Sequence, residues 1–274
     1  MTLGVGIIGC GSIGSVIAHA IDTGQAGETQ LLVVYDRVME KALYISQGLS
    51  NKPIIAKNFD EFLKCNYLGL VVEAASQDAV KDYAPMILRA GKDLMIMSAG
   101  ALIDHSFVKE IRCLAKENRR RVYIPSGAIA GLDSIKAATY SAIEKVTLTT
   151  RKPVEALKDS HYFSEKFGNK TIKAPLIIYE GPALEACKLF PFNVNVAATL
   201  SLAGIGPERT LVRIIADPTI NRNIHKIEVR GGFGTLEISI ENIPMPSNPK
   251  TSFLAALSAI AMLKRITDPL QVGT

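Results

Sequence analysis

The chain has 274 residues, which is enough for two domains of modest size. Hydrophobic residues make up 48% of it and charged residues 21%, an ordinary globular balance, and the formal net charge is +5. The basic residues are scattered, tryptophan is absent, and no basic stripe carries interleaved aromatic residues. The composition therefore argues against a nucleic-acid partner.

Neither the cysteines nor the opening residues indicate export or membrane insertion. The four cysteines have no close pair among them and fit neither a disulfide framework nor a zinc site; they are Cys10, Cys65, Cys113 and Cys187. No two histidines have metal-ligand spacing, so we expect no bound metal. The first residues lack the charged leader and cleavage site of a signal peptide, and no apolar run reaches the roughly 20 residues that span a bilayer. We expect a cytoplasmic protein without a membrane partner.

A glycine-rich string follows the first predicted strand. Residues 3–8 form a short apolar run, GCGSIG follows at positions 9–14, and apolar residues then recur at helical spacing. A GxGxxG string alone is weak evidence, but between a strand and an amphipathic helix it predicts a dinucleotide-binding turn.

Each position of this string has a physical role in such a turn. Gly9 permits the tight turn, Gly11 lets the backbone approach a pyrophosphate, and Gly14 lets the helix pack closely on the strand. Ser12 and Ile13 open the helix, whose free N–H groups and positive dipole end face the phosphates. We expect all five residues to contact a cofactor.

The next strand, residues 31–35, ends at an acid. Asp36 lies about 20 residues beyond the glycine string, where a carboxylate holds the adenosine ribose in dinucleotide-binding folds. A carboxylate there hydrogen-bonds the ribose hydroxyls and repels a 2′-phosphate, which favours NAD. Arg37 leaves NADP open, because a guanidinium could stack on adenine or tolerate the phosphate.

Strands then alternate with helices, which predicts a parallel, doubly wound sheet. The expected strands are 68–73, 94–98 and 122–124, and the expected helices are 78–88 and one capped by Asp104. Ligands bind such sheets beyond the carboxyl ends of the strands. The small residues at those ends are therefore candidate cofactor contacts, namely Ala74, Ala75, Ser98 and Ala99, with Ser76 as a candidate substrate contact.

The second half changes pattern. A helix at 133–140 is followed by strands without intervening helices, at 145–152, 210–216, 224–230 and 234–241. Gly231-Gly232 suits a tight hairpin between the last two. A proline-rich connector at 244–249 leads to a last helix with little polar face, which we expect to be buried against the first half.

The fold class is thus α/β, with an amino-terminal Rossmann domain at 1–124 and 244–274. An α+β domain with a mixed or antiparallel sheet, at 125–243, is inserted before the last helix.

His225 is the most informative polar residue of the second half. Residues two apart on a strand share a face, so His225 points with Ile227 and Val229 to the covered side of the sheet. A buried imidazole there is either a structural hydrogen-bonding group or a catalytic base, and strand position alone favours the structural role.

Four long runs resemble L-aspartate dehydrogenase: PSGAIAGLDSIKAA (125–138), TTRKP (149–153), FPFNVNVAATLSLAGIG (190–206) and ADPTINRNIH (216–225). The likeness spans nearly the whole chain, including NPKTSFLAALSAIAML near its end. It implies oxidation of L-aspartate by NAD or NADP to iminoaspartate, which hydrolyses to oxaloacetate and ammonia and is a precursor in NAD biosynthesis.

The resemblance also implies site residues. It makes His225 the catalytic residue, reversing the preference from strand position. It makes Ala128 a cofactor contact, together with Asn193 or Asn195, of which Asn195 is preferred. It implies a homodimer only by analogy with dehydrogenases of this build.

A dicarboxylate substrate needs cations. Arg151 and Lys152 end an alternating strand, in which Lys152 has the inward parity, and Lys136 is a third candidate. Histidine has a near-neutral pKa, which suits removal of a proton from the substrate amine. Two alternatives remain: another two-domain dehydrogenase of the homoserine dehydrogenase kind, and a dinucleotide-binding sensor without catalysis.

Overall fold

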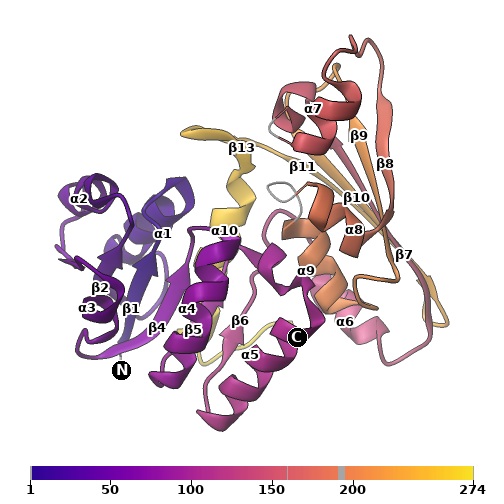
Figure 1. Cartoon of the computed structure of the whole chain (residues 1–274). Coiled ribbons are helices and arrows are strands. Elements are labelled where there is room, and N and C mark those ends of the chain that lie inside the picture. Colours follow the sequence, from indigo (N-terminus) through magenta and orange to yellow (C-terminus); the bar gives the residue numbers. More distant parts are fainter. Residues whose placement is uncertain (1, 159, 191–194, 274) are drawn as a thin grey trace. The chain divides into compact units, whose positions relative to one another are not determined.

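The computed structural model describes residues 2–158, 160–190 and 195–273. The chain divides into two compact units: Met1–Gly127 with Ala255–Val272, and Ala128–Leu254 with Gly273–Thr274 (Figure 1). The division based on sequence places the boundaries at 124/125 and 243/244, three and eleven residues earlier than in the structure.

The first unit is built on a six-stranded parallel sheet with the order β3-β2-β1-β4-β5-β6. This is the doubly wound order of a dinucleotide-binding fold, as the alternation of strands and helices predicts. The strands are β1 (Leu3–Ile8), β2 (Thr29–Tyr35), β3 (Ile54–Ile55), β4 (Leu68–Glu73), β5 (Asp93–Ile96) and β6 (Val122–Tyr123).

The helices of this unit include the predicted ones and several that the sequence pattern did not indicate. Asp104 caps α5 as expected, its carboxylate accepting hydrogen bonds from the backbone N–H of Ser106 at 2.8 Å and of Phe107 at 3.2 Å. The unpredicted elements are the strand β3 and the helices α2, α3 and η1. The helices are α1 (Ser12–Asp22), α2 (Met39–Gln47), α3 (Phe59–Leu63), α4 (Gln77–Arg89), η1 (Ala99–Ile103) and α5 (His105–Glu117).

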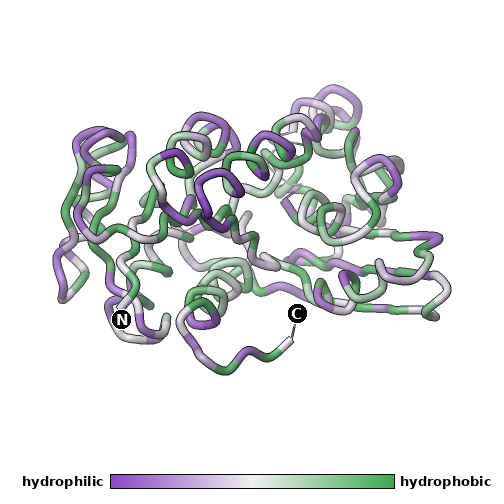
Figure 2. Tube along the Cα trace, turned by 90° about the horizontal axis from the view of Figure 1, so that it is seen from below, coloured by the Kyte–Doolittle hydropathy of each residue, from purple (hydrophilic) through white to green (hydrophobic). Residues whose placement is uncertain are grey.

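The last helix, α10 (Phe253–Thr267), completes the core of the first unit. Ala259 and Leu263 are fully buried in one cluster with Val5 and Ile17 of β1 and α1. The helix is therefore buried against the first half, as predicted, although Leu257 on another side of it is 41% exposed. Hydrophobic and hydrophilic stretches both occur along the trace (Figure 2), and β1 and β4 of the parallel sheet are buried along nearly their whole length.

The second unit contains a five-stranded sheet with the order β11-β10-β7-β9-β8. β7 and β9 are parallel and the other pairs are antiparallel, so the sheet is mixed. Gly231 pairs with Gly234, so the predicted hairpin is closed by a two-residue loop. The strands are β7 (Ile143–Lys152), β8 (Leu176–Pro182), β9 (Thr210–Ala216), β10 (Asn223–Gly231) and β11 (Gly234–Asn242).

Helices cover one face of this sheet. α8 and α9 contact β9, and alternate residues of β9 and β10 are buried, which places the covered face on the side of His225. β8, η2, α7 and α9 lie in a stretch where the sequence pattern predicts no element. The helices are α6 (Leu132–Ala138), η2 (Val154–Leu157), α7 (His161–Phe167), α8 (Ala183–Leu189) and α9 (Asn195–Ala203).

The stretch predicted as a rigid connector is instead a small hairpin. β12 (Pro244–Met245) pairs with β13 (Asn248–Ser252) in an antiparallel two-stranded sheet. Proline is tolerated in a strand at an edge or at its first residue, and in two strands every position is an edge. The prolines therefore shape this hairpin rather than prevent it.

Candidate active site

The glycine loop has the geometry that a dinucleotide requires. Gly9 has φ +94, and a Cβ there would lie 2.6 Å from the carbonyl carbon of Ala74 in the loop after β4. A Cβ at Gly14 would overlap the carbonyl oxygen of Gly9, so only glycine allows α1 to start this close to the strand. A Cβ at Gly11 would meet no atom within 4 Å, so this position is open to an approaching ligand.

The start of α1 adds the donors. Ser12 is the first residue of the helix and Ile13 the second, and Gly11 occupies the N-cap without a side-chain hydrogen bond. The first N–H groups of the helix are thus free to bind a pyrophosphate. The loop and the helix start fit a dinucleotide cofactor.

Asp36 is held in place by two backbone N–H groups, one of which belongs to the glycine loop. Its Oδ2 accepts a hydrogen bond from the backbone N–H of Cys10 at 2.7 Å, and its Oδ1 accepts one from Val38 at 2.8 Å. Carboxylate oxygens can each accept further bonds, so ribose hydroxyls remain acceptable partners. The neighbouring Arg37 is exposed.

Glu73, the last residue of β4, is a buried acid that the sequence reading missed. It is 1% exposed, and it accepts hydrogen bonds from the N–H of Ala75 at 2.8 Å, the N–H of Ser98 at 3.0 Å and the hydroxyl of Ser98 at 2.8 Å. Burial raises the pKa of Glu73, and these hydrogen bonds oppose that rise. The carboxyl group joins the two loops in which the small cofactor-contact candidates lie. A glutamate closing an otherwise apolar strand was the available signal.

The small residues of these loops have structural roles as well. Ser76 is the N-cap of α4, and its Oγ accepts a hydrogen bond from the N–H of Ala79 at 3.1 Å. Its hydroxyl proton is still available to a ligand. Ala99 begins η1 and is buried, and Ala74 donates its N–H to the carbonyl of Ile8 at 2.8 Å.

In the second unit, His225 lies on the covered face of β10, as strand parity predicts. It is 2% exposed, it pairs in register with Thr150 of β7, and its Nδ1 lies 3.1 Å from the Thr150 hydroxyl oxygen. Burial, together with the nearby charge of Lys152, lowers the pKa of His225 to about 3. The expectation of a near-neutral pKa is therefore wrong for the chain by itself, and the imidazole is neutral.

Lys152 has the inward orientation that its parity predicts. It lies two residues beyond Thr150 on β7 and is 5% exposed, and burial lowers its pKa to about 8. Thr150, Lys152 and His225 thus form a cluster of a hydroxyl, an amine and an imidazole on one covered face, which we call the inner-face cluster.

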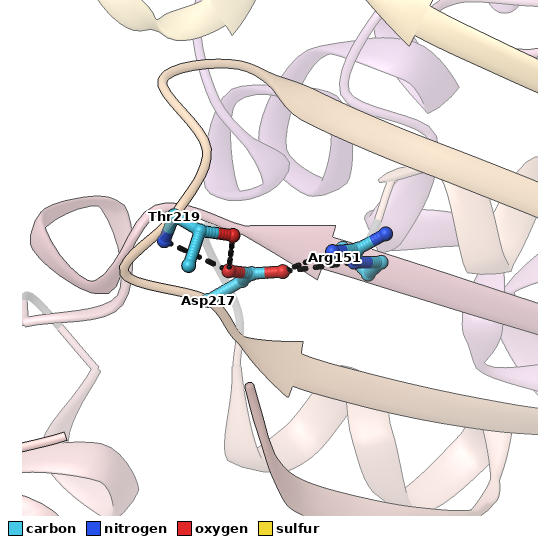
Figure 3. Close-up of polar contacts among 3 residues, drawn as sticks. All are labelled: Arg151, Asp217 and Thr219. Carbon is cyan, nitrogen blue, oxygen red and sulfur yellow. Dashed lines mark hydrogen bonds and ion pairs between the residues drawn. The ribbon is translucent and has the colours of Figure 1, made fainter. Parts of the chain in front are cut away.

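Arg151 points away from the inner-face cluster and has a partner within the protein. Its Nε donates to Oδ2 of Asp217 at 2.9 Å, and a second guanidinium nitrogen makes a closer contact with the same oxygen (Figure 3). Thr219 donates to Oδ1 of Asp217 from its N–H at 2.9 Å and from its hydroxyl at 2.6 Å. Burial would raise the pKa of Asp217, but these hydrogen bonds outweigh it and keep the carboxyl ionised.

This second buried acid was also missed by the sequence reading. Asp217 follows β9, its side chain is fully buried, and its backbone N–H donates to the carbonyl of Lys152 at 2.8 Å. The pair of Asp217 and Arg151 therefore fixes the end of β7, where Lys152 lies.

The remaining candidates of the second unit are Lys136, Asn195, Asn193 and Ala128. Lys136 is exposed on α6, and Asn195 is exposed at the start of α9. Asn193 lies outside the described residues. The carbonyl of Ala128 accepts a hydrogen bond from the side-chain nitrogen of Asn242 at 3.0 Å.

The part of the chain that the structure describes contains no group of three or more histidine, cysteine, aspartate and glutamate side chains placed to hold a metal ion. None of its helices combines the length and apolar character that crossing a membrane requires.

Comparison with known proteins matches both halves of the chain. The family described as "Homoserine dehydrogenase, NAD binding domain" matches residues 9–125, and the family described as "Aspartate dehydrogenase, C-terminal" matches residues 133–266. An L-aspartate dehydrogenase of Methanocella arvoryzae is 48% identical over 98% of this chain and 99% of its own length. The chain belongs to the L-aspartate dehydrogenase family.

Other members of the family agree with this assignment. An L-aspartate dehydrogenase of Nitrosopumilus maritimus is 45% identical over 98% of this chain and 99% of its own length. The crystal structure of aspartate dehydrogenase from Thermotoga maritima superposes with a TM-score of 0.79, at 29% identity and with full coverage of both chains. The chain is accordingly an NAD(P)-dependent oxidoreductase that acts on the CH–NH2 group of an amino acid.

Proposed function

We propose that this member of the family oxidises L-aspartate to iminoaspartate, which then hydrolyses to oxaloacetate and ammonia. The observation that carries the proposal is the inner-face cluster, in which a neutral imidazole and a buried amine lie on the same covered face. An anionic amino acid that must lose a proton needs both groups. The names of the relatives support the choice of aspartate.

Of the three cationic candidates, we assign substrate binding to Lys152. Arg151 is engaged by Asp217 and Lys136 is exposed, whereas Lys152 lies on the face of His225. Below its pKa of about 8 the ammonium is charged, and a substrate carboxylate is its natural partner in a water-poor setting.

His225 is the proposed general base. In the tautomer in which Nδ1–H donates to the Thr150 hydroxyl oxygen, Nε2 has a free lone pair. Nε2 takes the proton of the substrate ammonium, because only a neutral amine can push electrons toward the α-carbon. A carboxylate bound beside Lys152 offsets the lysine charge and raises the pKa of His225 toward the range that this step needs. Once Nε2 has released this proton to solvent, its lone pair can accept a proton from the water that attacks the imine.

The cofactor fits the first unit. Residues 9–14 and Asp36 would hold the pyrophosphate and ribose, with Ala74, Ala75, Ser98 and Ala99 at the sheet edge. Ala128 and an asparagine of the 193–195 stretch are proposed as the cofactor contacts from the second unit. When bound, the dinucleotide supplies the hydride acceptor, nicotinamide C4. The Asp36 carboxylate favours NAD over NADP, because a 2′-phosphate would face a fixed negative charge.

We further propose a cytoplasmic homodimer that supplies iminoaspartate to NAD biosynthesis. The four cysteines are all free, which suits a reducing compartment.

The test is an absorbance assay at the NADH band with purified protein. L-Aspartate with NAD is expected to give a signal, L-aspartate with NADP a weaker one, and D-aspartate and L-homoserine none. A signal with L-homoserine alone would transfer the chain to homoserine dehydrogenase chemistry. Binding of NADH without turnover of any amino acid would favour the sensor.

A further inference from the structure

Asn242, the last residue of β11, lies on the same covered face as His225. It pairs in register with Asn223, and Ile240 pairs with His225, across the antiparallel β10–β11 ladder. Directly opposite residues of such a ladder share a face, as do residues two apart on one strand. Two asparagines therefore extend the inner-face cluster by one step along the sheet.

The side-chain nitrogen of Asn242 fixes a loop that comes from 114 residues earlier in the chain. It donates to the carbonyl of Ala128 at 3.0 Å. Three residues further, Gly131 packs so closely on Ile238 of β11 that a Cβ would overlap the isoleucine side chain. The inner face of β11 thus holds the loop of residues 128–131 at two points, and Ala128 is one of them.

The side-chain oxygen of Asn242 has no such partner. The residue is 2% exposed, and no donor among the described residues reaches its Oδ1. The orientation of the amide is settled by Ala128, because a backbone carbonyl can accept only from the nitrogen side. A buried acceptor without a donor is uncommon in folded proteins and needs a reason.

The position of this oxygen separates it from the other buried polar atoms without partners. Among the described residues these are Thr147 Oγ1 and Arg213 Nε. Their strand positions have the opposite parity to Leu148 and Val212, which are buried on the covered face, so both belong to the other side of the sheet. Asn242 alone of the three shares the face of His225 and Lys152.

We propose that Asn242 is a ligand-binding residue of the reaction, whose Oδ1 accepts a hydrogen bond from an N–H of the ligand while its nitrogen fixes Ala128. Two reactants carry such a donor, the amino group of aspartate and the carboxamide of nicotinamide. This inference rests on the proposed function, because both donors belong to its reactants.

The experiment replaces Asn242 by leucine, which keeps the branching of the side chain at Cγ and removes both polar atoms. Asn118→Leu is the matched control, since Asn118 likewise donates its side-chain amide to a backbone carbonyl, that of Leu114 at 2.9 Å, but lies in the first unit. Kinetics are measured with NAD and with 3-acetylpyridine adenine dinucleotide, in which a methyl ketone replaces the carboxamide and no N–H remains. Asn242→Ala repeats the set should the leucine variant yield little folded protein.

Two results support the proposal and name the donor. If the donor is the carboxamide, Asn242→Leu lowers kcat/KM about tenfold more with NAD than with the analogue, because the loss of the bond to Ala128 affects both cofactors alike. If it is the amine, the KM for aspartate rises about tenfold with either cofactor, and the dissociation constant of NADH changes much less than this KM.

Two other results overturn the proposal. In the first, Asn242→Leu changes neither kcat/KM nor the KM for aspartate by more than twofold relative to wild type. In the second, Asn118→Leu changes these constants as much as Asn242→Leu does. An inactive wild-type enzyme would instead refute the proposed function, and NADH titration of the Asn242 variants would still test the carboxamide arm.

Discussion

The glycine loop of the parallel sheet and the covered face of the mixed sheet offer a ligand different chemical groups. At residues 9–14 the ligand meets backbone N–H groups and positions without a Cβ. On the mixed sheet it meets buried ionisable side chains from β7 and β10, which the strand register brings together. In the proposed function, backbone groups of the first region bind the cofactor, whereas side chains of the second select the substrate and move the proton. Substitutions in the two regions should therefore change different kinetic and binding constants.

The largest effect is expected for His225→Ala. Removal of a general base costs about 100-fold or more in kcat, because no other group accepts the proton of the substrate ammonium. The dissociation constant of NADH, measured by fluorescence titration, should stay within twofold of wild type. A variant that keeps kcat within tenfold would show that His225 is structural after all.

Lys152→Met should act on the substrate rather than on the cofactor. Loss of a charge-assisted partner for a carboxylate raises the aspartate KM by about tenfold to 100-fold. Lys136→Met removes the same charge from an exposed position and is the control. Equal effects of the two changes would remove Lys152 from substrate binding and reduce the contrast between the two regions.

A smaller and opposite pattern is expected at the glycine loop. Asp36→Ala should lower the ratio of kcat/KM with NAD to kcat/KM with NADP by about tenfold, because the charge that repels the 2′-phosphate is removed. The aspartate KM should change little. Asp22→Ala is the matched control, since Asp22 also accepts two backbone hydrogen bonds, from Ser50 at 2.8 Å and Asn51 at 2.9 Å. A ratio that Asp36→Ala leaves unchanged would assign the cofactor preference to another residue.

The smallest effect concerns stability at acid pH. Burial and Lys152 lower the pKa of His225 from 6.5 to about 3, so the unfolded chain binds a proton that the folded chain does not. The associated stability is fully present above pH 6.5 and is lost as the pH falls from there toward 3. His225→Gln should therefore flatten the fall in melting temperature between pH 6.5 and 4.5 by about 5–9 °C. His161→Gln, at a side chain that is 94% exposed, should leave the fall unchanged. An equal slope in wild type and His225→Gln would contradict the lowered pKa.

The same contrast explains what sequence could and could not reveal. The proposed roles of Gly9, Gly14 and Asp36 could be predicted from the sequence because they follow from local spacing. Asp104 was predicted as a helix cap for the same reason. Strand parity also placed His225 and Lys152 on the covered face, as the structure confirms.

The features that the sequence did not reveal depend on contacts between residues that are distant in the chain. The partners that hold Glu73, Asp217 and Asn242 lie up to 114 residues away, and no spacing rule connects them. The pairing of Arg151 with Asp217 changed the choice among the cations for the same reason. β8, with no clear alternation of apolar and polar residues, gave no strand signal.

The position of α10 has a consequence for how the protein is made. Ala259 and Leu263 complete a cluster that begins with Val5, so the first unit joins residues from the two ends of the chain. A ribosome releases the glycine loop and its sheet long before it releases this helix. The dinucleotide-binding unit therefore cannot complete its core until the whole mixed-sheet unit has emerged. A truncation after residue 250 would keep every glycine of the loop and still lose the core that supports it, and such nascent chains should be the ones that chaperones retain.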